Sequence, residues 1–209
     1  MNPAPGQELH HLLTTARALV LDFDGTLADT TTGHETALRS ALSVHGVPLD
    51  SLWYRQHAGL SIYDLLNELS AGSQAPAEEI VQHSRTLLLR HLDTIAPIPC
   101  TAALLQSARR AGLPCAIASG AAGTLVHPAL KVLGLTGEFT AVVVREDVPF
   151  GKPAPDLFSE AARRLGVPAP DCLAVDDSPA GVAAAQAAGM RTLTLTDGVL
   201  TQPIPTGPL

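Results

Sequence analysis

Aromatic and basic residues are scarce in this chain of 209 residues. Aromatic side chains make up only 3% of it, so a surface on which the bases of single-stranded nucleic acid could stack is not expected. Lysine and arginine number 13 against 20 acidic residues, which gives a formal net charge of −7. Nucleic acids and anionic membranes both attract basic surfaces. We therefore expect neither of them as a partner.

Cysteine is scarce as well, and its placement argues against two kinds of site. Cys100, Cys115 and Cys172 are odd in number and show no CxxC spacing. We expect small buried side chains in a reducing compartment rather than a disulfide or a zinc site. The first 20 residues include an acidic residue and no long apolar run. This predicts neither a signal peptide nor a membrane span, and so a cytoplasmic protein.

Short apolar runs alternate with helix-like stretches along most of the chain. Each run is rich in Val, Ile, Leu or Thr without strict alternation, which is typical of strands covered on both faces. The predicted strands are 18–23, 114–119, 141–146, 172–177 and 191–196, and the predicted helices between them are 103–111, 124–133, 155–165 and 179–188. This order predicts an α/β fold with a parallel sheet between two layers of helices. The tail from Gly198 is expected to be loose or laid on the surface.

One long stretch after the first predicted strand contains no strand of its own. Helices are expected instead at 35–45, 61–69 and 78–92. Such an insertion would form a small helical domain above the C-terminal edge of the sheet, where open parallel sheets bind ligands. We therefore expect a core domain of residues 1–29 and 98–209 and a helical cap domain of residues 30–97.

Acidic residues follow two of the predicted strands directly. The first strand runs into Asp22 and Asp24, which alternation places on the same side, and Gly25 then permits a sharp turn and close backbone approach to a ligand. The fourth runs into Asp176 and Asp177. Carboxylates this close repel one another unless a cation lies between them or one holds a proton. A site for a hard cation such as Mg²⁺, with room for a phosphate, fits this pattern.

Two further strand ends carry groups that suit an anion. Ser119 and Gly120 offer a hydroxyl and free amides at a strand-to-helix turn. Lys152 precedes a proline, so we expect it in an extended segment outside a helix. Taken in order, four strand ends supply a carboxylate pair, a hydroxyl, a lysine and a second carboxylate pair. This set contains a nucleophile, an anion donor, a cation and metal ligands.

Four segments together carry a resemblance to a known family. They are LVLDFDGTLADT, AIASG, FGKPAPDLF and CLAVDDSPAGVAAAQAAGM, which occur in the family's order between about residues 18 and 196. With them the chain strongly resembles the haloacid dehalogenase-like hydrolases, in the branch that includes phosphoglycolate phosphatases, sugar-phosphate phosphatases and beta-phosphoglucomutase. The resemblance implies a doubly wound, Rossmann-like core with an inserted all-helical cap.

The resemblance also implies roles for the acids. Asp22 would attack phosphorus and become an aspartyl-phosphate. Asp24 would protonate the leaving oxygen and then activate water, and we expect closure of the cap to dry the site so that Asp24 holds a proton near neutral pH. Mg²⁺ would be held by Asp22, by the backbone carbonyl of Asp24 and by Asp177. Asp176 would bind the ion through a water molecule or support the ligands from behind.

The remaining site residues would bind substrate. By the same resemblance, Ser119 donates to the phosphoryl oxygens, and Lys152 neutralises both the nucleophile and the transferring group. Gly25 and Gly120 would lie against the substrate through their backbones. A histidine in the position of His34 often points at the substrate in members with a cap, although a solvent-facing role is equally consistent with the sequence.

The function expected is therefore a Mg²⁺-dependent phosphatase acting on a small phosphorylated metabolite such as a sugar, polyol or glycolate phosphate, in a monomer or weak homodimer. A beta-phosphoglucomutase-like phosphomutase is the alternative within the family. Ala121, Ala122 and Gly123 supply no side-chain donors for a second phosphate, and the segment at 59–61 lacks an arginine, although Arg55 could substitute. An alternative of another class is a receiver-type phospho-acceptor module, but that class lacks the large insertion after the first strand.

Overall fold

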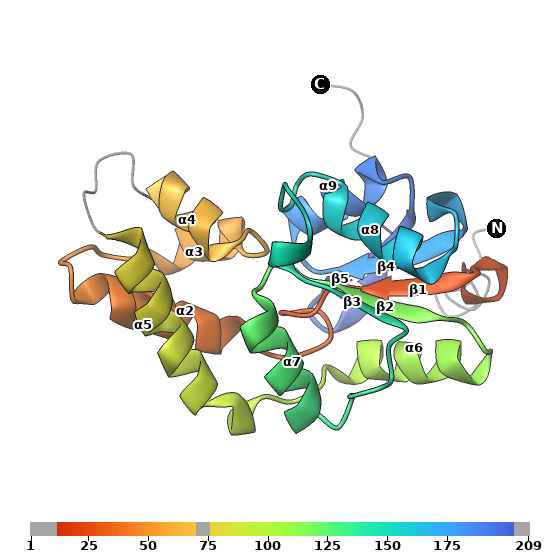
Figure 1. The fold of residues 1–209 in the computed structure, drawn as a ribbon, viewed down its shortest axis with the longest axis horizontal. Coiled ribbons are helices and arrows are strands. Elements are labelled where there is room, and N and C mark those ends of the chain that lie inside the picture. Colours follow the sequence, from red (N-terminus) through yellow and green to blue (C-terminus); the bar gives the residue numbers. More distant parts are fainter. Residues whose placement is uncertain (1–11, 70–75, 203–209) are drawn as a thin grey trace.

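The computed structural model describes residues 12–69 and 76–202. Residues 1–11 and 203–209, which begin the N-terminal segment and end the tail considered above, lie outside the described residues. Figure 1 shows a sheet flanked by helices at one end of the molecule and a group of inserted helices at the other. Among the described residues, every helix is too short or too polar to serve as a membrane span.

A six-stranded sheet in the order β3-β2-β1-β4-β5-β6 forms the centre of the core. Its strands are β1 Ala18–Leu21, β2 Cys115–Ala118, β3 Ala141–Val143, β4 Cys172–Asp176, β5 Arg191–Thr196 and β6 Val199–Thr201. The first five are parallel, and β6 pairs antiparallel with β5. In the register of β1, Leu21 lies opposite both Ile117 of β2 and Val175 of β4. The segments that follow β1, β2 and β4 therefore leave the sheet side by side at its C-terminal edge.

Helices cover both faces of this sheet, so the doubly wound parallel architecture expected from the alternating pattern is confirmed (Figure 1). One face carries α6 and α7 and the other carries α8 and α9; their bounds are α6 Pro99–Arg110, α7 Gly123–Val132, α8 Asp156–Leu165 and α9 Pro179–Ala187. Short 3₁₀ turns occur at η1 Leu92–Thr94, η2 Arg145–Asp147 and η3 Ala169–Asp171.

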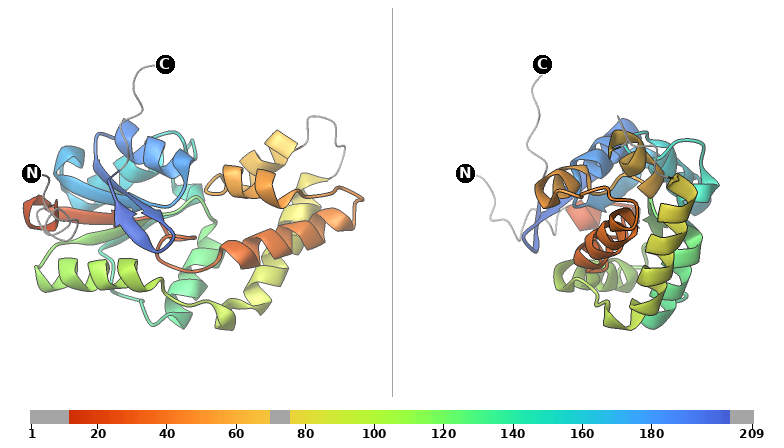
Figure 2. Two further views of the ribbon diagram at one scale, coloured as in Figure 1. Left: turned by 180° about the vertical axis from the view of Figure 1, so that it is seen from behind. Right: turned by 90° about the vertical axis from the view of Figure 1, so that its left-hand side faces the viewer.

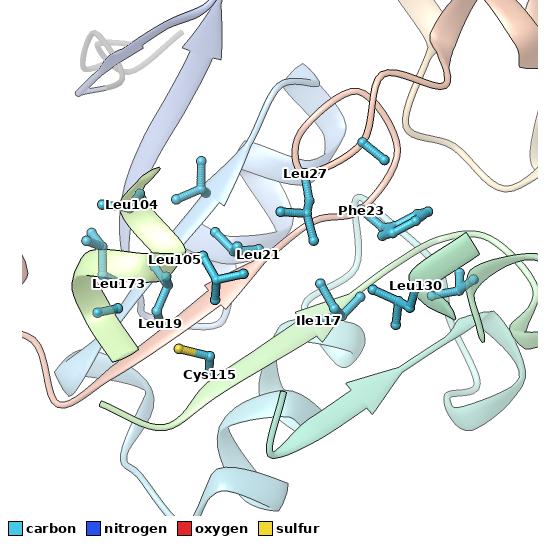
Figure 3. Packing of buried hydrophobic residues seen from close by; sticks show 14 of the residues in the cluster. Leu19, Leu21, Phe23, Leu27, Leu104, Leu105, Cys115, Ile117, Leu130 and Leu173 are labelled. Carbon is cyan, nitrogen blue, oxygen red and sulfur yellow. The ribbon is translucent and has the colours of Figure 1, made fainter. Parts of the chain in front are cut away.

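Successive residues of β1 point to opposite faces and enter two different hydrophobic clusters. Leu19 and Leu21 pack with Leu104 and Leu105 of α6, as Figure 3 shows. Val20 packs on the other side in the cluster that contains Phe158 of α8. Because both faces are buried, β1 needs apolar residues at every position rather than at every second one. This explains the continuous apolar run in the sequence.

The inserted helices have a hydrophobic cluster of their own. They are α2 Thr31–Ser43, α3 Ser51–His57, α4 Ile62–Leu69 and α5 Ala77–Arg90. Leu38 and Leu42 of α2, Leu66 of α4 and Ile80 of α5 are buried together. Figure 2 shows α2 and α5 lying side by side. The two passages of chain that join these helices to the core also pair with each other: Asp29 N donates to Ala96 O at 2.9 Å.

The sequence missed two elements. The first is α3, which is too short for a helical period to show, although Asp50 marks its start by accepting a hydrogen bond from Trp53 N at 2.7 Å. The second is β6. Of the two alternatives expected for the tail from Gly198, a loose segment is wrong for Val199–Thr201, because backbone pairing with β5 holds this largely exposed segment at the edge of the sheet. The predicted strands are all present, but four of them extended one to three residues too far at one or both ends, into the loops that carry the polar groups.

Phe158 is fully buried between α8 and the sheet, whereas Phe150 is 66% exposed. We expect Phe158→Ala to lower the free energy of unfolding by about 3–5 kcal/mol, because it removes a large apolar side chain and leaves a cavity. Phe150→Ala is the matched control and should change it by less than about 0.5 kcal/mol. Denaturant unfolding followed by circular dichroism measures both. Equal losses in the two variants would contradict the packing described here.

Candidate functional site

Lys152 lies at the centre of the polar site at the C-terminal edge of the sheet. Its side chain is 1% exposed. Its Nζ donates to Asp22 Oδ1 and to Asp176 Oδ2, the latter at 2.7 Å. It also lies 5.5 Å from the ring centroid of Phe158. The lysine after β3 thus joins the acids after β1 and β4.

The charge of Lys152 is fixed by these two carboxylates. Burial by itself would lower the pKa of Lys152, but Asp176 and Asp22 outweigh burial and raise the pKa above its ordinary value. The two carboxylates therefore favour the ammonium form, so that Lys152 supplies a cation to the site rather than a base.

Three carboxylates form a group around this cation. Oxygen atoms of Asp22, Asp176 and Asp177 lie within 4.8 Å of one another. Burial raises the pKa of Asp22 well above its usual value; Lys152 opposes this rise, and Asp176 and Asp177 add to it. Burial, with Asp176 second, raises the pKa of Asp177 to about 6. Two buried carboxylates and a partly buried one facing one ammonium leave excess negative charge, and oxygen ligands of this kind suit a hard divalent cation.

Asp176 and Asp177 point to different partners although they are adjacent. Asp176 Oδ1 accepts from Ser178 N at 2.9 Å and from Ser178 Oγ at 2.8 Å. Asp177 Oδ1 accepts from Thr26 Oγ1 at 2.7 Å, and Asp177 N donates to Thr26 Oγ1 at 3.0 Å. Asp176 is therefore largely used in holding Lys152 and the start of α9, while Asp177 is tied to the turn after β1. Thr26 has this positioning part without having been predicted as a site residue.

Gly25 lies where the turn after β1 meets Asp177. Its φ is +77°, a left-handed conformation that side chains rarely adopt. A Cβ at this position would also come within 2.5 Å of Asp177 Oδ2. The turn can bring its backbone this close to the carboxylate group only because Gly25 has no side chain, which agrees with the close approach expected from the sequence.

The protonation of Asp24 differs from what the sequence led us to expect. It lines the same pocket as Asp22, but its side chain is not part of the carboxylate group. Its Oδ1 accepts from Thr30 Oγ1 at 2.7 Å and lies 3.0 Å from His34 Nε2. Burial would raise the pKa of Asp24, yet His34 and Thr30 outweigh burial and lower it. The expectation that Asp24 holds a proton near neutral pH is therefore wrong for this conformation, because His34 stabilises the ionised carboxylate.

The pKa of His34 shifts in the opposite direction to that of Asp24. Burial would lower its pKa, but the carboxylate of Asp24 outweighs burial and raises the pKa above its usual value. The proton of this pair thus resides on the imidazole, and the pair as a whole faces the pocket. The structure places His34 at the site, which the sequence left open.

Ser119 and Gly120 form the turn after β2. Ser119 is fully buried, and its Oγ accepts from Ala121 N at 3.0 Å, which leaves the hydroxyl proton available for a further acceptor. Gly120 lines the pocket, and a Cβ there would lie 3.3 Å from the carbonyl oxygen of Gly59 in the helical insertion. This turn therefore lies between the core and the insertion.

The pocket above these groups is a cavity of about 500 Å³ between the core and the inserted helices. Asp22, Asp24 and Asp177 line its core side. The loop at Gly59 approaches the core so closely that a Cβ on Gly59 would overlap Ser178 Oγ. Arg55, which the sequence offered as a pocket arginine, is exposed and lines neither this pocket nor the carboxylate group. Arg85 of α5 lines the pocket instead, and no local motif in the sequence marks it.

Comparisons with known proteins agree with this geometry. The family model described as haloacid dehalogenase-like hydrolase matches residues 16–189. The fructose-1-phosphate phosphatase YqaB of Escherichia coli is 32% identical over 178 residues, which cover 82% of this chain and 92% of that relative. A hydrolase from Pseudomonas syringae superimposes with a TM-score of 0.80 at 28% identity, covering 88% of this chain and 85% of the other. CbbY from Rhodobacter sphaeroides, in complex with xylulose-1,5-bisphosphate, gives 0.76 at 25% identity, covering 85% and 84%.

The Asp24–His34 pair can be tested by titration. We expect the pKa of His34 in the wild type to lie above its ordinary value. In Asp24→Asn it should fall below that value, since burial remains and the carboxylate is gone. Stability supplied by this ion pair is present at pH values below the raised pKa of His34 and is lost as the pH rises through it. Two-dimensional ¹H–¹⁵N NMR of the imidazole measures the pKa directly.

Asp29→Asn is the control for this titration, since Asp29 is an exposed acid in the same segment. It should leave the pKa of His34 raised. A His34 pKa that is the same in the wild type and in Asp24→Asn would show that the pair does not form in solution.

Proposed function

The chain belongs to the haloacid dehalogenase-like hydrolases and is a phosphatase, and on this premise we propose that it hydrolyses small phosphate monoesters through an aspartyl-phosphate on Asp22. One observation carries the proposal. The Nζ of Lys152 bridges Asp176 and Asp22, and Asp22 lines the pocket together with Asp177. The carboxylate that we propose as nucleophile thus lies beside a cation and further anionic ligands, which supports phosphoryl transfer.

Asp22 would act as the nucleophile. Lys152 holds one of its oxygens, Oδ1, and so fixes the orientation of the carboxylate. In the first step a bond forms between an Asp22 oxygen and phosphorus, while the bond from phosphorus to the ester oxygen breaks and that oxygen takes up a proton. In the second step water attacks phosphorus, gives up a proton, and releases inorganic phosphate with Asp22 restored. Lys152 and the hydroxyl of Ser119 would donate to the phosphoryl oxygens.

A divalent cation would be held by Asp22, Asp177 and Asp176, with Mg²⁺ the ion we propose. The carboxylates fit such an ion, because burial and mutual repulsion raise the pKa values of Asp22 and Asp177 when only Lys152 opposes them. When bound, the cation would neutralise this excess charge and polarise the phosphoryl oxygens. Ionisation of Asp22, which attack requires, is favoured by the same positive charge.

The Asp24–His34 pair would handle the proton. The pKa of Asp24 is lowered and that of His34 is raised, so the pair carries a single proton that lies on His34 in this conformation. We propose that Asp24 delivers this proton to the leaving oxygen and takes one from water in the second step. Rotation of His34 away from Asp24 would leave that carboxyl buried and able to hold the proton itself.

The substrate we propose is a small phosphorylated metabolite such as a sugar, polyol or glycolate phosphate. The cavity has room for a phosphate and a small body, and two similar proteins are named for, or bound to, sugar phosphates. Ala121 and Ala122 line the pocket after Ser119 and Gly120, without side-chain donors for a second phosphate at that turn. This favours a phosphatase over a phosphomutase. Incubation with a hexose 1-phosphate separates them, since isomerisation without release of phosphate would identify a mutase.

Asp22 provides the test of mechanism. Asp22→Asn should lower kcat for p-nitrophenyl phosphate by at least about 10⁴-fold, because the nucleophile is lost. ¹⁹F NMR of the wild type with beryllium and fluoride salts should show bound beryllofluoride, which the variant should lack. Asp171→Asn is the matched control, since Asp171 is an acid paired with Arg17 before β4 and is remote from the pocket. Normal turnover in Asp22→Asn would refute the aspartyl-phosphate.

Asp177→Asn should separate cation binding from stability. With EDTA at pH 8, the free energy of unfolding of the variant should exceed that of the wild type by on the order of 1–3 kcal/mol, since the substitution removes a carboxylate whose pKa is raised to about 6. The variant should therefore have the higher Tm. The gain should shrink as the pH falls through 6, where Asp177 of the wild type takes up its proton. Addition of Mg²⁺ should raise the Tm of the wild type and not of the variant. A variant that keeps the full Mg²⁺ shift would show that Asp177 is not a ligand.

A further inference from the structure

The pocket presents two chemically different sides. Its core side carries the carboxylates of Asp22, Asp24 and Asp177, and the proposed reaction takes place there. Its other side comes from the inserted helices, where aliphatic residues such as Leu65 and Leu88 lie among hydroxyl-bearing ones such as Ser84. A ligand bound over Asp22 therefore extends from an acidic floor toward a side of mixed character. Besides His34, which is paired with Asp24, one charged side chain lies on that second side.

Arg85 of α5 is that charged group. Its Nε is buried and has no hydrogen-bond partner. Arg85 also forms no ion pair with any carboxylate of residues 12–69 or 76–202. Arg145, the other arginine of the pocket, donates to Val148 O at 2.9 Å and to Pro149 O at 3.3 Å. Arg145 is thus held by the core, whereas Arg85 is left with donors unused.

Two acids, one of the pocket and one of α5, have partners other than Arg85. Glu146 lines the same pocket, but its Oε2 accepts from Gly123 N at 3.1 Å. Glu78 of α5 accepts from the hydroxyl of Tyr63 at 3.3 Å. Burying a charged donor without a partner destabilises a folded protein. Most buried polar groups in folded proteins have a partner, so one that lacks it inside a ligand pocket points to the ligand as the missing acceptor.

We propose that Arg85 binds a second anionic group of the substrate, a carboxylate or a phosphate, while the phosphate to be cleaved lies over Asp22. This inference rests on the proposed function, which places the reacting phosphate at Asp22. It narrows the substrates to phosphate monoesters that carry a second oxyanion. It also makes Arg85 a determinant of specificity that contacts the part of the substrate that does not react.

The shape of the guanidinium group favours an oxyanion over a hydroxyl. The Nε–H and a neighbouring Nη–H of arginine form a fork that matches two oxygens of a carboxylate or phosphate. A hydroxyl would accept from one of these donors and leave the positive charge without compensation. The Nε of Arg85 is buried, and burial strengthens the attraction between the guanidinium group and an anion. Lysine at this position would keep the charge and lose the fork.

Matched substrate pairs test the proposal. The first pair is 2-phosphoglycolate and ethyl phosphate, which differ in a carboxylate; the second is fructose 1,6-bisphosphate and fructose 1-phosphate, which differ in a phosphate. We expect the wild type with Mg²⁺ to prefer the doubly anionic member of at least one pair. Arg85→Gln should reduce that preference, measured as the ratio of kcat/KM values within the pair, by about 10- to 150-fold. The substrate pair for which Arg85→Gln loses the preference identifies the anion that Arg85 binds. Most of the loss should appear in KM.

Two further variants keep the result interpretable. Arg85→Lys should retain part of the preference, because it keeps the charge. Arg90→Gln, an exposed arginine on the same helix, should retain all of it. The Tm of Arg85→Gln should not fall, since no partner within the protein is lost, whereas a fall would indicate a structural role for Arg85.

The outcomes of this experiment are distinct. A wild type that fails to release phosphate from p-nitrophenyl phosphate with Mg²⁺ would refute the proposed function. A wild type that hydrolyses p-nitrophenyl phosphate but shows no preference in either pair would overturn the role of Arg85. A preference that survives unchanged in Arg85→Gln would overturn it as well.

Discussion

The contact of one buried lysine with two buried carboxylates organises this protein. Lys152 Nζ donates to both Asp22 and Asp176, and none of the three side chains is more than 5% exposed. Removing such charges from water is costly, and only close pairing compensates for the cost. Asp177 adds a third carboxylate that the lysine does not balance. The site therefore carries excess negative charge, which favours the binding of a cation and lowers the stability of the folded protein. In the proposed function, that cation would offset the repulsion between the carboxylates and the phosphate.

The fold supplies the geometry that this contact requires. Parallel pairing brings the ends of β1 and β4 together, so Asp22 and Asp176 need no long loops to meet. Gly25 lets the chain turn against Asp177 without a side chain in the way. The helical insertion then covers the carboxylates, and its loop at Gly59 contacts the core at Ser178. The residues proposed to react thus lie at the ends of strands. The residues that would select the substrate lie on helices, which two paired passages of chain join to the core.

Local sequence predicted the core well because its signals are local. Strands covered on both faces need continuous apolar runs, and the acids that end them stand beside those runs in the chain. Lys152 could be expected outside a helix because proline follows it. The prediction was wrong at two contacts between segments that are close in the chain. His34, ten residues after Asp24, lowers the pKa of that carboxyl, and Val199–Thr201 pair with β5 across the turn at Asp197 and Gly198. The Asp-Gly turn is a hairpin signal that the prediction overlooked, whereas the contact of His34 with Asp24 depends on how the passage after β1 folds in space.

The sequence by itself determined the sheet, the order of the polar strand ends, and the identity of the carboxylates and the lysine. These follow from the period of apolar residues and from residue types that only a few kinds of chemistry use. The tertiary structure alone decided which charges are paired and which are left over. It buried Lys152 between two acids, set the proton of the Asp24–His34 pair on the imidazole, and placed Arg85 in the pocket without a partner. The reason is physical: pairing and pKa depend on distance and burial in space, and the sequence specifies neither until the chain has folded.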